Sequence, residues 1–293
     1  MDGILNIHKQ SGVTSHDVVQ AARKILKEKR IGHTGTLDPM ATGVLVLCVG
    51  KATRIAQYLE AGEKEYEAVM RLGQTTDTLD AEGRVLETRA YVPPDRSQVL
   101  KALDCFIGSI MQKPPAYSAL KVAGVPSYKL ARQGKAEPLK PRPVTISRIT
   151  LQEFEDPFVS LAVRCSKGVY IRTLCADLGE ALLAGAHLTK LVRTRSGRFT
   201  IDNAVTLDRL AELAAAGSLE QVLVSIDDAL ADMPSVTVSA PEAGRVLHGN
   251  SVPLRGDLTM AGSLLVRIHG PSGVLLALGR PVQDEIRPEL VFS

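Results

Sequence analysis

The sequence predicts an α/β protein with a main domain over residues 1–232 and a small β-barrel over residues 233–293. Up to residue 232, strand-like segments are interspersed with segments whose apolar residues recur at helical spacing. From residue 233 onward, short apolar segments are separated by many glycines, which is typical of a barrel of short strands. The length of 293 residues fits about two domains.

The composition excludes several classes of protein. No apolar run approaches the roughly 18 residues that a membrane span requires. The start, Met1-Asp2-Gly3, lacks the apolar stretch of a secretory signal, so we expect a cytoplasmic protein. The cysteines form no C-x-x-C pair, which predicts buried, reduced thiols and excludes the zinc nucleobase deaminases. They are Cys48, Cys105, Cys165 and Cys175.

The first 60 residues predict two strands and two helices. Residues 4–7 form the first strand, and Thr14 or Ser15 can cap the helix that follows. Residues 44–49 are a continuous apolar run that predicts a buried strand, and residues 53–60 predict a second helix. The first helix has apolar residues at helical spacing, namely Val18, Ala22, Ile25 and Leu26. Its other face is basic and carries Arg23, Lys24, Lys27 and Arg30.

Between these elements, residues 32–43 form a loop that holds Asp38 on a stiff turn. Three glycines and a proline in twelve residues disfavour a regular element, and the residue before Pro39 is pushed to extended geometry. A lone Asp-Pro is usually an Asx turn. This loop carries more polar side chains than a connector needs, namely His33, Thr34, Thr36, Asp38 and Thr42. The spacing from Gly43 to Gly50 is too long for a phosphate-binding P-loop.

The next segments predict a strand, a connection and a short helix. Residues 64–73 alternate as a strand does, with Tyr66 on the inner face, where the pattern alone predicts a core residue. Residues 75–83 contain three acids before a glycine, but their spacing is not that of an EF-hand. We therefore predict a turn-rich connection there, with a metal site as the less favoured alternative. Residues 97–106 predict the short helix.

Residues 113–143 form a predicted basic insertion. Residues 113–142 contain seven Lys/Arg residues and a single acid, Glu137. Tyrosines interleaved with lysines are typical of binding to looped RNA, because bases stack on the tyrosine rings and phosphates pair with the lysines. The alternative is that these lysines form a solvated basic face. Residues 128–132 predict a helical turn, and three prolines in residues 137–143 predict an extended exit. The cations expected on RNA phosphates are Lys121, Lys129 and Arg132.

The segment after the insertion predicts a hairpin followed by a helix. Residues 144–154 and 158–165 are two predicted strands around a turn. A helix is predicted to begin near Tyr170. On that helix, the pattern alone would make Arg172 one half of a surface ion pair.

The last part of the main domain predicts a helix and a linker. Residues 202–217 are Ala-rich and predict the helix, and residues 227–234 predict the linker. His187 is expected to be structural. Clustered positive charge is typical of phosphate binding. A second basic cluster consists of Lys190, Arg193, Arg195 and Arg198.

Three strings resemble the signature of the TruB-type tRNA pseudouridine synthases. The first is Gly-His-Thr-Gly-Thr-Leu-Asp-Pro at residues 32–39, followed by Ala-Thr-Gly-Val-Leu. The second runs from Cys165 to Leu174, and the third from Gly185 to Leu191. The family isomerises the uridine at position 55 in the T loop of tRNA. The resemblance implies a largely antiparallel central sheet, an insertion that clasps the tRNA arm, and a terminal RNA-binding barrel of the PUA type.

The resemblance also implies roles for individual residues. Asp38 takes the place of the catalytic nucleophile, and Arg172 that of its partner. Tyr66 corresponds to an active-site tyrosine, which could stack near the sugar and move a proton. The other residues expected to contact the substrate are His33, which would enter the space vacated by the flipped uridine, and Tyr170 and Leu191, which would line the pocket.

Pseudouridine formation breaks the bond between ribose and uracil N1 and rejoins the base through C5. Because no electron or phosphoryl group is transferred, we expect neither a cofactor nor a metal ion. A carboxylate nucleophile is required, and an arginine within about 4–6 Å would lower its pKa. The resemblance implies the T stem-loop of tRNA as the substrate, and we expect a monomer.

Two other functions fit parts of the sequence. A non-catalytic tRNA-binding or folding factor would account for the basic segments and the terminal barrel. A nucleoside or glycoside hydrolase would use Asp38 as nucleophile, but no second carboxylate lies at a recognisable spacing to serve as its acid.

Overall fold

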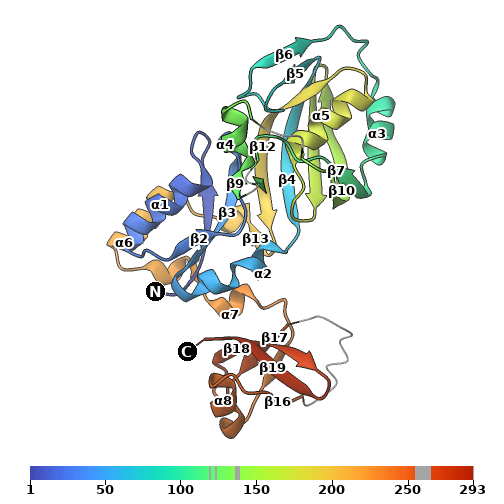
Figure 1. Cartoon of the computed structure of the whole chain (residues 1–293). Coiled ribbons are helices and arrows are strands. Elements are labelled where there is room, and N and C mark those ends of the chain that lie inside the picture. Colours follow the sequence, from blue (N-terminus) through green and yellow to red (C-terminus); the bar gives the residue numbers. More distant parts are fainter. Residues whose placement is uncertain (119, 123, 136–138, 255–264, 293) are drawn as a thin grey trace.

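The computed structural model describes residues 1–118, 120–122, 124–135, 139–254 and 265–292. A long mixed sheet forms the main body, and a smaller sheet lies at the C-terminal end (Figure 1). In this part of the chain, no helix is long and apolar enough to cross a membrane.

The main sheet has ten strands in the described residues, and it is antiparallel except where β3 and β12 run side by side. The prediction of a largely antiparallel central sheet is therefore confirmed. Along its path the sheet consists of β14 (Leu223–Val224), β1 (Gly3–Lys9), β3 (Thr42–Val49), β12 (Ala186–Ser196), β4 (Lys64–Leu72), β11 (Phe158–Cys165), β10 (Arg142–Glu155) and β7 (Gly108–Gln112). Two short strands, β2 (Ile31–His33) and β13 (Phe199–Thr200), pair with β3 and β12.

The burial of β3 and β4 follows from their sequence patterns. Alternation in β4 places Tyr66 on a buried face with Ala68, Met70 and Leu72, as predicted. Strand β3 is apolar at nearly every position because both of its faces are covered. Leu45, Leu47 and Val49 belong to one hydrophobic cluster, whereas Val44, Val46 and Cys48 belong to another. The end of β3 that follows the Asp38 loop is therefore fixed between two hydrophobic clusters.

The helices α1 (Ser15–Leu26), α3 (Arg96–Asp104) and α5 (Ile171–Ala181) lie close to their predicted places. Thr14 caps α1, with Asp17 completing a capping box. The predicted helix 53–60 is instead a 3₁₀ helix, η1 (Gly50–Ile55), followed by the short α2 (Ala56–Glu60).

The predicted helix 202–217 is interrupted. A 3₁₀ turn, η2 (Ile201–Asn203), is followed by an extended residue, Val205, and then by α6 (Leu207–Ala215). The backbone of Val205 exchanges hydrogen bonds with β1, because its N–H donates to the Asn6 carbonyl at 2.9 Å and its carbonyl accepts from His8 at 2.8 Å. These long-range bonds take the place of the helical ones that the Ala-rich composition predicts.

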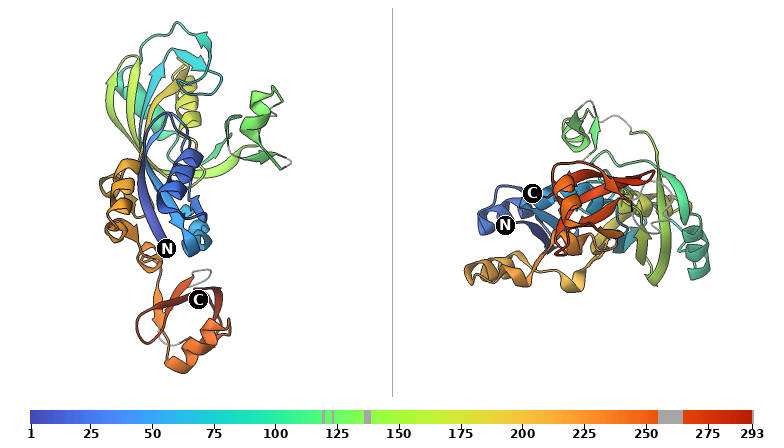
Figure 2. Two further views of the ribbon diagram at one scale, coloured as in Figure 1. Left: turned by 90° about the vertical axis from the view of Figure 1, so that its left-hand side faces the viewer. Right: turned by 90° about the horizontal axis from the view of Figure 1, so that it is seen from below.

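Two smaller pieces project from the main sheet. A hairpin of β5 (Gln74–Thr76) and β6 (Val85–Thr88) follows β4. The basic insertion contains a second hairpin, β8 (Lys121–Val122) and β9 (Val125–Pro126), and the predicted helical turn, α4 (Ser127–Arg132). Figure 2 shows the insertion standing away from the sheet on one side of the molecule.

The C-terminal sheet is a five-stranded half-barrel in the described residues, with no pairing between its two end strands. It is therefore more open than the barrel that the sequence predicts. In spatial order the strands are β15 (Ser235–Thr237), β17 (Val266–His269), β18 (Leu275–Val282), β19 (Glu285–Val291) and β16 (Val252–Pro253). A helix that the sequence pattern did not predict, α8 (Ala240–Leu247), packs against the sheet. The remaining short elements of the chain are η3 (Leu219–Gln221) and α7 (Ile226–Ala229).

Three of the four cysteines are buried thiols, as expected, but Cys105 is exposed. It lies directly after the last residue of α3, where the helix ends at the surface. Burial raises the pKa of Cys48, Cys165 and Cys175 to about 12, so these thiols stay protonated at neutral pH.

The predicted linker, residues 227–234, forms packed contacts with the half-barrel. Asp227 lies on α7 and accepts hydrogen bonds from Arg267 at 2.7 Å and from His269 at 2.9 Å, both on β17. Burial opposes ionisation of Asp227, but these two donors hold its pKa below the usual value. Leu278 of β18 also packs in one hydrophobic cluster with Ala229 and Leu230. Charge pairing and apolar burial thus join the half-barrel to the main body.

Replacing Asp227 with Ala should remove the acceptor for both β17 donors and lower the free energy of unfolding by about 1–3 kcal/mol. Urea denaturation of the full chain measures this change. Asp232→Ala is the matched control, because Asp232 is exposed on the same segment. Equal stability of the two variants would show that apolar contacts alone hold residues 227–234 against the half-barrel.

Candidate active site

The loop that carries Asp38 is held from below by Arg193 of β12. The Arg193 side chain is 2% exposed and donates three hydrogen bonds to backbone carbonyls. Its Nε donates to Val44 at 2.7 Å, and its Nη atoms donate to Gly35 at 3.0 Å and to Thr36 at 3.3 Å. These carbonyls lie at the two ends of the loop, so one rigid guanidinium fixes both. Arg193 therefore holds the loop and does not form part of the surface cluster that the sequence predicted.

Lys9 of β1 performs a similar task at the tip of the loop. Its Nζ is buried and donates to the carbonyls of Ala41 at 2.6 Å and Pro39 at 3.0 Å. Burial lowers the pKa of Lys9 to about 8, although nearby Asp38 opposes this shift. Ser15 of α1 also exchanges two hydrogen bonds with the backbone of Leu37, at 2.8 and 3.1 Å.

Gly43 shows how tightly the end of this loop is packed. Its φ is +98°, and a Cβ placed there would lie 2.2 Å from the carbonyl oxygen of Arg193. Only glycine fits both the conformation and the space. The loop motif therefore ends in glycine because the backbone of Arg193, on strand β12, lies against it.

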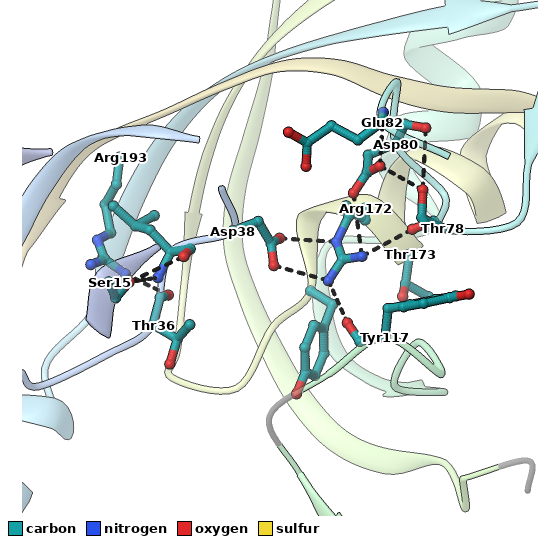
Figure 3. A network of polar contacts seen from close by, with 12 residues as sticks. Ser15, Thr36, Asp38, Thr78, Asp80, Glu82, Tyr117, Arg172, Thr173 and Arg193 are labelled. Atoms are coloured by element: carbon teal, nitrogen blue, oxygen red, sulfur yellow. Dashed lines mark hydrogen bonds and ion pairs between the residues drawn. The ribbon is translucent and has the colours of Figure 1, made fainter. Parts of the chain in front are cut away.

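Asp38 faces Arg172, which lies in the first turn of α5 (Figure 3). The Nε and Nη2 atoms of Arg172 lie 2.9 Å and 3.0 Å from the two carboxylate oxygens of Asp38. The Arg172 side chain is 4% exposed, whereas that of Asp38 is 31% exposed. The guanidinium is therefore buried behind a carboxylate that remains accessible. This placement contradicts a surface ion pair and agrees with the partnership that the resemblance implies.

Asp80 is a second carboxylate on the same guanidinium, and the sequence interpretation missed it. Its Oδ2 lies 3.3 Å from Nη1 of Arg172, and its side chain is 5% exposed. Thr78 and the backbone N–H of Glu82 donate to the other Asp80 oxygen at 2.5 and 3.1 Å. The only signal in the sequence was the density of acids in residues 75–83, which was interpreted as a connection.

Two backbone carbonyls complete the contacts of Arg172. Nη1 donates to the Thr78 carbonyl at 3.0 Å, and Nη2 donates to the Tyr117 carbonyl at 2.8 Å. Thr78 follows β5, and Tyr117 lies at the beginning of the basic insertion. One buried side chain thus joins the Asp38 loop, the β5–β6 connection and the insertion.

The pKa of Asp38 is raised above its usual value. Burial is the main cause, and the negative charge of Asp80 adds to it, whereas the positive charge of Arg172 acts in the opposite direction. The sequence prediction that Arg172 lowers the pKa of Asp38 gave the sign of that one contribution but not the net result. Two carboxylates share one guanidinium, so neither receives its full charge.

Tyr66 and Leu191 lie on neighbouring strands and are both buried. In the β4–β12 register, Tyr66 is opposite Arg193, and Leu191 is opposite Ala68. Burial raises the pKa of Tyr66, while the Arg193 charge opposes this, and the charge of Asp38 contributes a smaller upward shift. Tyr66 is therefore a protonated hydroxyl at neutral pH, within electrostatic range of Asp38.

Tyr170 and His33 are half-buried. Tyr170 is the residue that precedes α5, and the Gln112 amide holds its backbone through hydrogen bonds of 2.8 and 3.0 Å. Burial raises the pKa of Tyr170, and Asp38 is among the charges that affect it. His33 ends β2, and its pKa is lowered by burial and by the charge of Arg193, so it is mostly neutral at physiological pH.

The cations that the sequence predicted on RNA phosphates lie in different environments. Lys129 is exposed on α4. The side chains of Lys121 and Arg132 lie outside the described part of the chain. In the second basic cluster, Arg193 is buried, and Arg195 pairs with Glu65 at 2.7 Å. His187 is buried with its Nδ1 2.9 Å from the Gln74 carbonyl, which fits the structural role that we expected.

Comparison with known proteins indicates a family. Residues 23–171 match the TruB family pseudouridylate synthase (N terminal domain), and residues 172–231 match the tRNA pseudouridylate synthase B C-terminal domain. A protein of Dechloromonas aromatica named tRNA pseudouridine synthase B is 46% identical, covering 96% of this chain and 92% of its own length. A protein of the same name from Burkholderia lata is 44% identical, covering 99% of this chain and 89% of its own.

Solved structures agree with this similarity. A chain of an H/ACA RNP bound to a substrate RNA containing 2'-deoxyuridine aligns with a TM-score of 0.75 and 27% identity, over 99% of this chain and 85% of its own. A chain of the archaeal box H/ACA sRNP Nop10-Cbf5 complex aligns with a TM-score of 0.76 and 26% identity, over 99% and 86%. Both main body and half-barrel are therefore shared with these structures.

Replacing Asp80 with Asn should lower the pKa of Asp38, because it removes the like charge on the far side of Arg172. Carbon-13 NMR titration of the Asp38 carboxyl group measures this directly. Asp77→Asn is the matched control, since Asp77 lies in the same connection and accepts from the Arg84 N–H rather than from Arg172. An unchanged or higher pKa of Asp38 in the Asp80 variant would contradict the shared guanidinium.

Proposed function

The chain belongs to the TruB family of pseudouridylate synthases, and we propose that it isomerises the uridine at position 55 in the T loop of tRNA, with Asp38 as nucleophile. The observation that carries the assignment of Asp38 is its ion pair with Arg172, at 2.9 and 3.0 Å, on a loop held by buried cations. The partly exposed carboxylate is the only side of this pair that a substrate can reach.

In the proposed reaction, Asp38 adds to the substrate and the bond between C1′ of the ribose and N1 of uracil breaks. The uracil turns within the pocket, C5 bonds to C1′, and Asp38 leaves. N1 gains one proton and C5 loses one, so the product is an isomer of the substrate. Asp38 has a raised pKa and is free after the last step, which suits it to accept the C5 proton.

Arg172 orients the nucleophile and keeps it ionised. A buried guanidinium with two nitrogen atoms on one carboxylate fixes the plane of that carboxylate. Asp80 and the Thr78 carbonyl in turn fix the guanidinium. Because Asp38 must be ionised to attack and its pKa is raised, the acidic limb of the kcat/KM profile should lie above the pKa of an ordinary aspartate.

The substrate uridine has to leave its stack to reach Asp38, at a cost of a few kcal/mol. In our proposal, Tyr66, Tyr170 and Leu191 line the pocket that receives the base, and His33 fills the space it leaves. The raised pKa of Tyr66 keeps its hydroxyl protonated at neutral pH, so the hydroxyl can donate a hydrogen bond to the substrate. The half-barrel is proposed to be a PUA-like RNA-binding domain, and the enzyme a cytoplasmic monomer.

The central experiment maps pseudouridine in an unmodified tRNA transcript, incubated with the protein in chelator and without cofactor. We expect one new pseudouridine, in the T loop. Asp38→Asn should lower turnover by more than about a thousandfold while leaving tRNA binding nearly intact. Asp77→Asn, a nearby aspartate that accepts a backbone hydrogen bond from Arg84, should remain active.

Two further variants test the partners of Asp38. Arg172→Met should be severely impaired and less stable, because it leaves two carboxylates without their cation. Tyr66→Phe should be less impaired than Asp38→Asn if the ring matters more than the hydroxyl. If the wild type binds tRNA but leaves every uridine unchanged, the protein is a binding or folding factor; release of free uracil would instead identify a hydrolase.

The proposed role of the insertion is tested through salt dependence. Replacing Lys121, Lys129 and Arg132 with Gln should weaken tRNA binding. The slope of log K against log salt should shrink by about 0.7–0.9 for each phosphate that the variant no longer binds. The matched control replaces Arg96 and Lys101, which are exposed on α3, and it should keep the wild-type slope. An unchanged slope in the insertion variant would assign these cations to a solvated surface.

A further inference from the structure

A second basic surface lies far from the insertion. We call it the α1–η1 ridge and define it as residues 23–30 and 50–54. These thirteen residues contain seven Lys/Arg residues and a single acid, Glu28. This is a denser excess of positive charge than the insertion has. The members with exposed side chains are Lys24, Lys27, Lys29, Arg30 and Arg54.

The fold holds the two halves of the ridge together. Lys27 ends α1 in a left-handed conformation, with φ at 52°, and turns the chain toward β2. The Arg30 carbonyl then accepts a hydrogen bond from the Gly50 N–H at 2.7 Å, at the beginning of η1. Residues 23–30 and 50–54 are thus joined through their backbones, although they lie about twenty positions apart in the sequence.

The exposed cations of residues 23–30 are poorly compensated by the protein itself. Arg30 lies 3.8 Å from Glu28, at the outer limit of an ion pair. Within the described residues, no ion pair involves Lys24, Lys27 or Lys29. Neighbouring like charges repel one another, and a polyanion would relieve this repulsion by displacing counterions. A surface of this kind is the electrostatic footprint of nucleic acid binding.

The position of the ridge relative to Asp38 indicates which part of an RNA it meets. Strand β3 connects the two sites, with the Asp38 loop entering at Thr42 and η1 leaving after Val49. Eight residues of strand span roughly 25 Å. At its far end, Arg54 donates to the Val291 carbonyl of β19 at 2.7 Å, so the ridge reaches the half-barrel.

Figure 2 places α1 and the insertion on the same side of the main sheet, with the half-barrel beyond α1. An RNA held by the insertion at Asp38 can therefore continue along α1 toward the C-terminal domain without crossing the sheet. With a hairpin loop at Asp38, the stem of that hairpin would run toward the ridge, and the duplex stacked on the end of the stem would lie over the ridge.

We propose that the α1–η1 ridge binds the phosphates of double-stranded RNA beyond the T stem, about 25 Å from the reacting uridine. The proposal rests on the proposed function, because it takes the T loop to be at Asp38. The ridge then contributes to the affinity for intact tRNA and takes no part in the chemistry. It makes no use of base identity, since lysine and arginine on an RNA backbone recognise charge and helix shape.

The test compares two substrates, an intact tRNA transcript and the isolated T stem-loop hairpin, with the full-length protein. The variant is Lys24→Gln with Lys29→Gln, which leaves the strained backbone at Lys27 unchanged. KM for intact tRNA should rise roughly tenfold at 0.15 M salt, with a salt slope lower by about 0.9 for each phosphate that the variant no longer binds. KM for the hairpin and kcat for both substrates should stay at wild-type values. The control is the Arg96→Gln, Lys101→Gln variant on α3.

Each outcome decides the proposal. A rise in KM for tRNA alone, absent from the α3 control, supports the ridge as a duplex-binding surface. Equal effects on tRNA and hairpin would place the ridge against the T arm itself and overturn the proposal, as would no effect on either. If the wild-type protein converts neither RNA, the proposed function fails instead, and that result is visible before any variant is compared.

Discussion

The buried guanidinium of Arg172 is the group on which the active site depends. A charge that is removed from water requires partners at close range, or it destabilises the fold by several kcal/mol. Here the partners come from three separate segments: Asp38, Asp80 with the Thr78 carbonyl, and the Tyr117 carbonyl. The requirement to pair one cation therefore sets the position of the Asp38 loop, the β5–β6 connection and the start of the insertion. Burial of Asp38, to which the negative charge of Asp80 adds, explains why the pKa of Asp38 is raised although an arginine lies beside it.

Two other buried cations act on the opposite side of the Asp38 loop. Lys9 and Arg193 bind only carbonyl oxygens there, so they hold the backbone without neutralising a carboxylate. A loop with so many of its carbonyls engaged has little freedom to reorganise when the substrate arrives. Such preorganisation would favour catalysis, because the geometry of Asp38, the proposed nucleophile, is established during folding and not during the reaction.

The fold separates this rigid centre from the surfaces proposed to hold RNA. The proposed reacting groups lie beside β3, both faces of which are covered by apolar clusters, and beside the buried faces of β4 and β12. The exposed cations proposed to contact RNA lie on elements at the periphery, namely the insertion and the α1–η1 ridge. Affinity can therefore be distributed over a long, salt-sensitive surface, while the chemistry stays in a small buried site. Membership of the TruB family and the fold shared with a chain of an H/ACA RNP bound to a substrate RNA agree with this arrangement.

Local sequence determined the elements and the positions of the principal side chains. The cap at Thr14, the alternation that buries Tyr66 and the Gly-rich turn before Pro39 are short-range effects, and a resemblance over residues 32–39 and 165–174 was enough to pair Asp38 with Arg172. Tertiary structure alone decided the rest. Asp80 is a second carboxylate on Arg172, and Arg193 lies in the interior rather than in a basic cluster. Pairing with β1 interrupts the predicted helix at Val205, and Asp227 binds β17, so the predicted linker packs against the half-barrel. Each of these features depends on a partner that is distant in the sequence. A buried charge or an unpaired backbone group binds the donor or acceptor that the fold places beside it, and local sequence patterns do not encode which group that is.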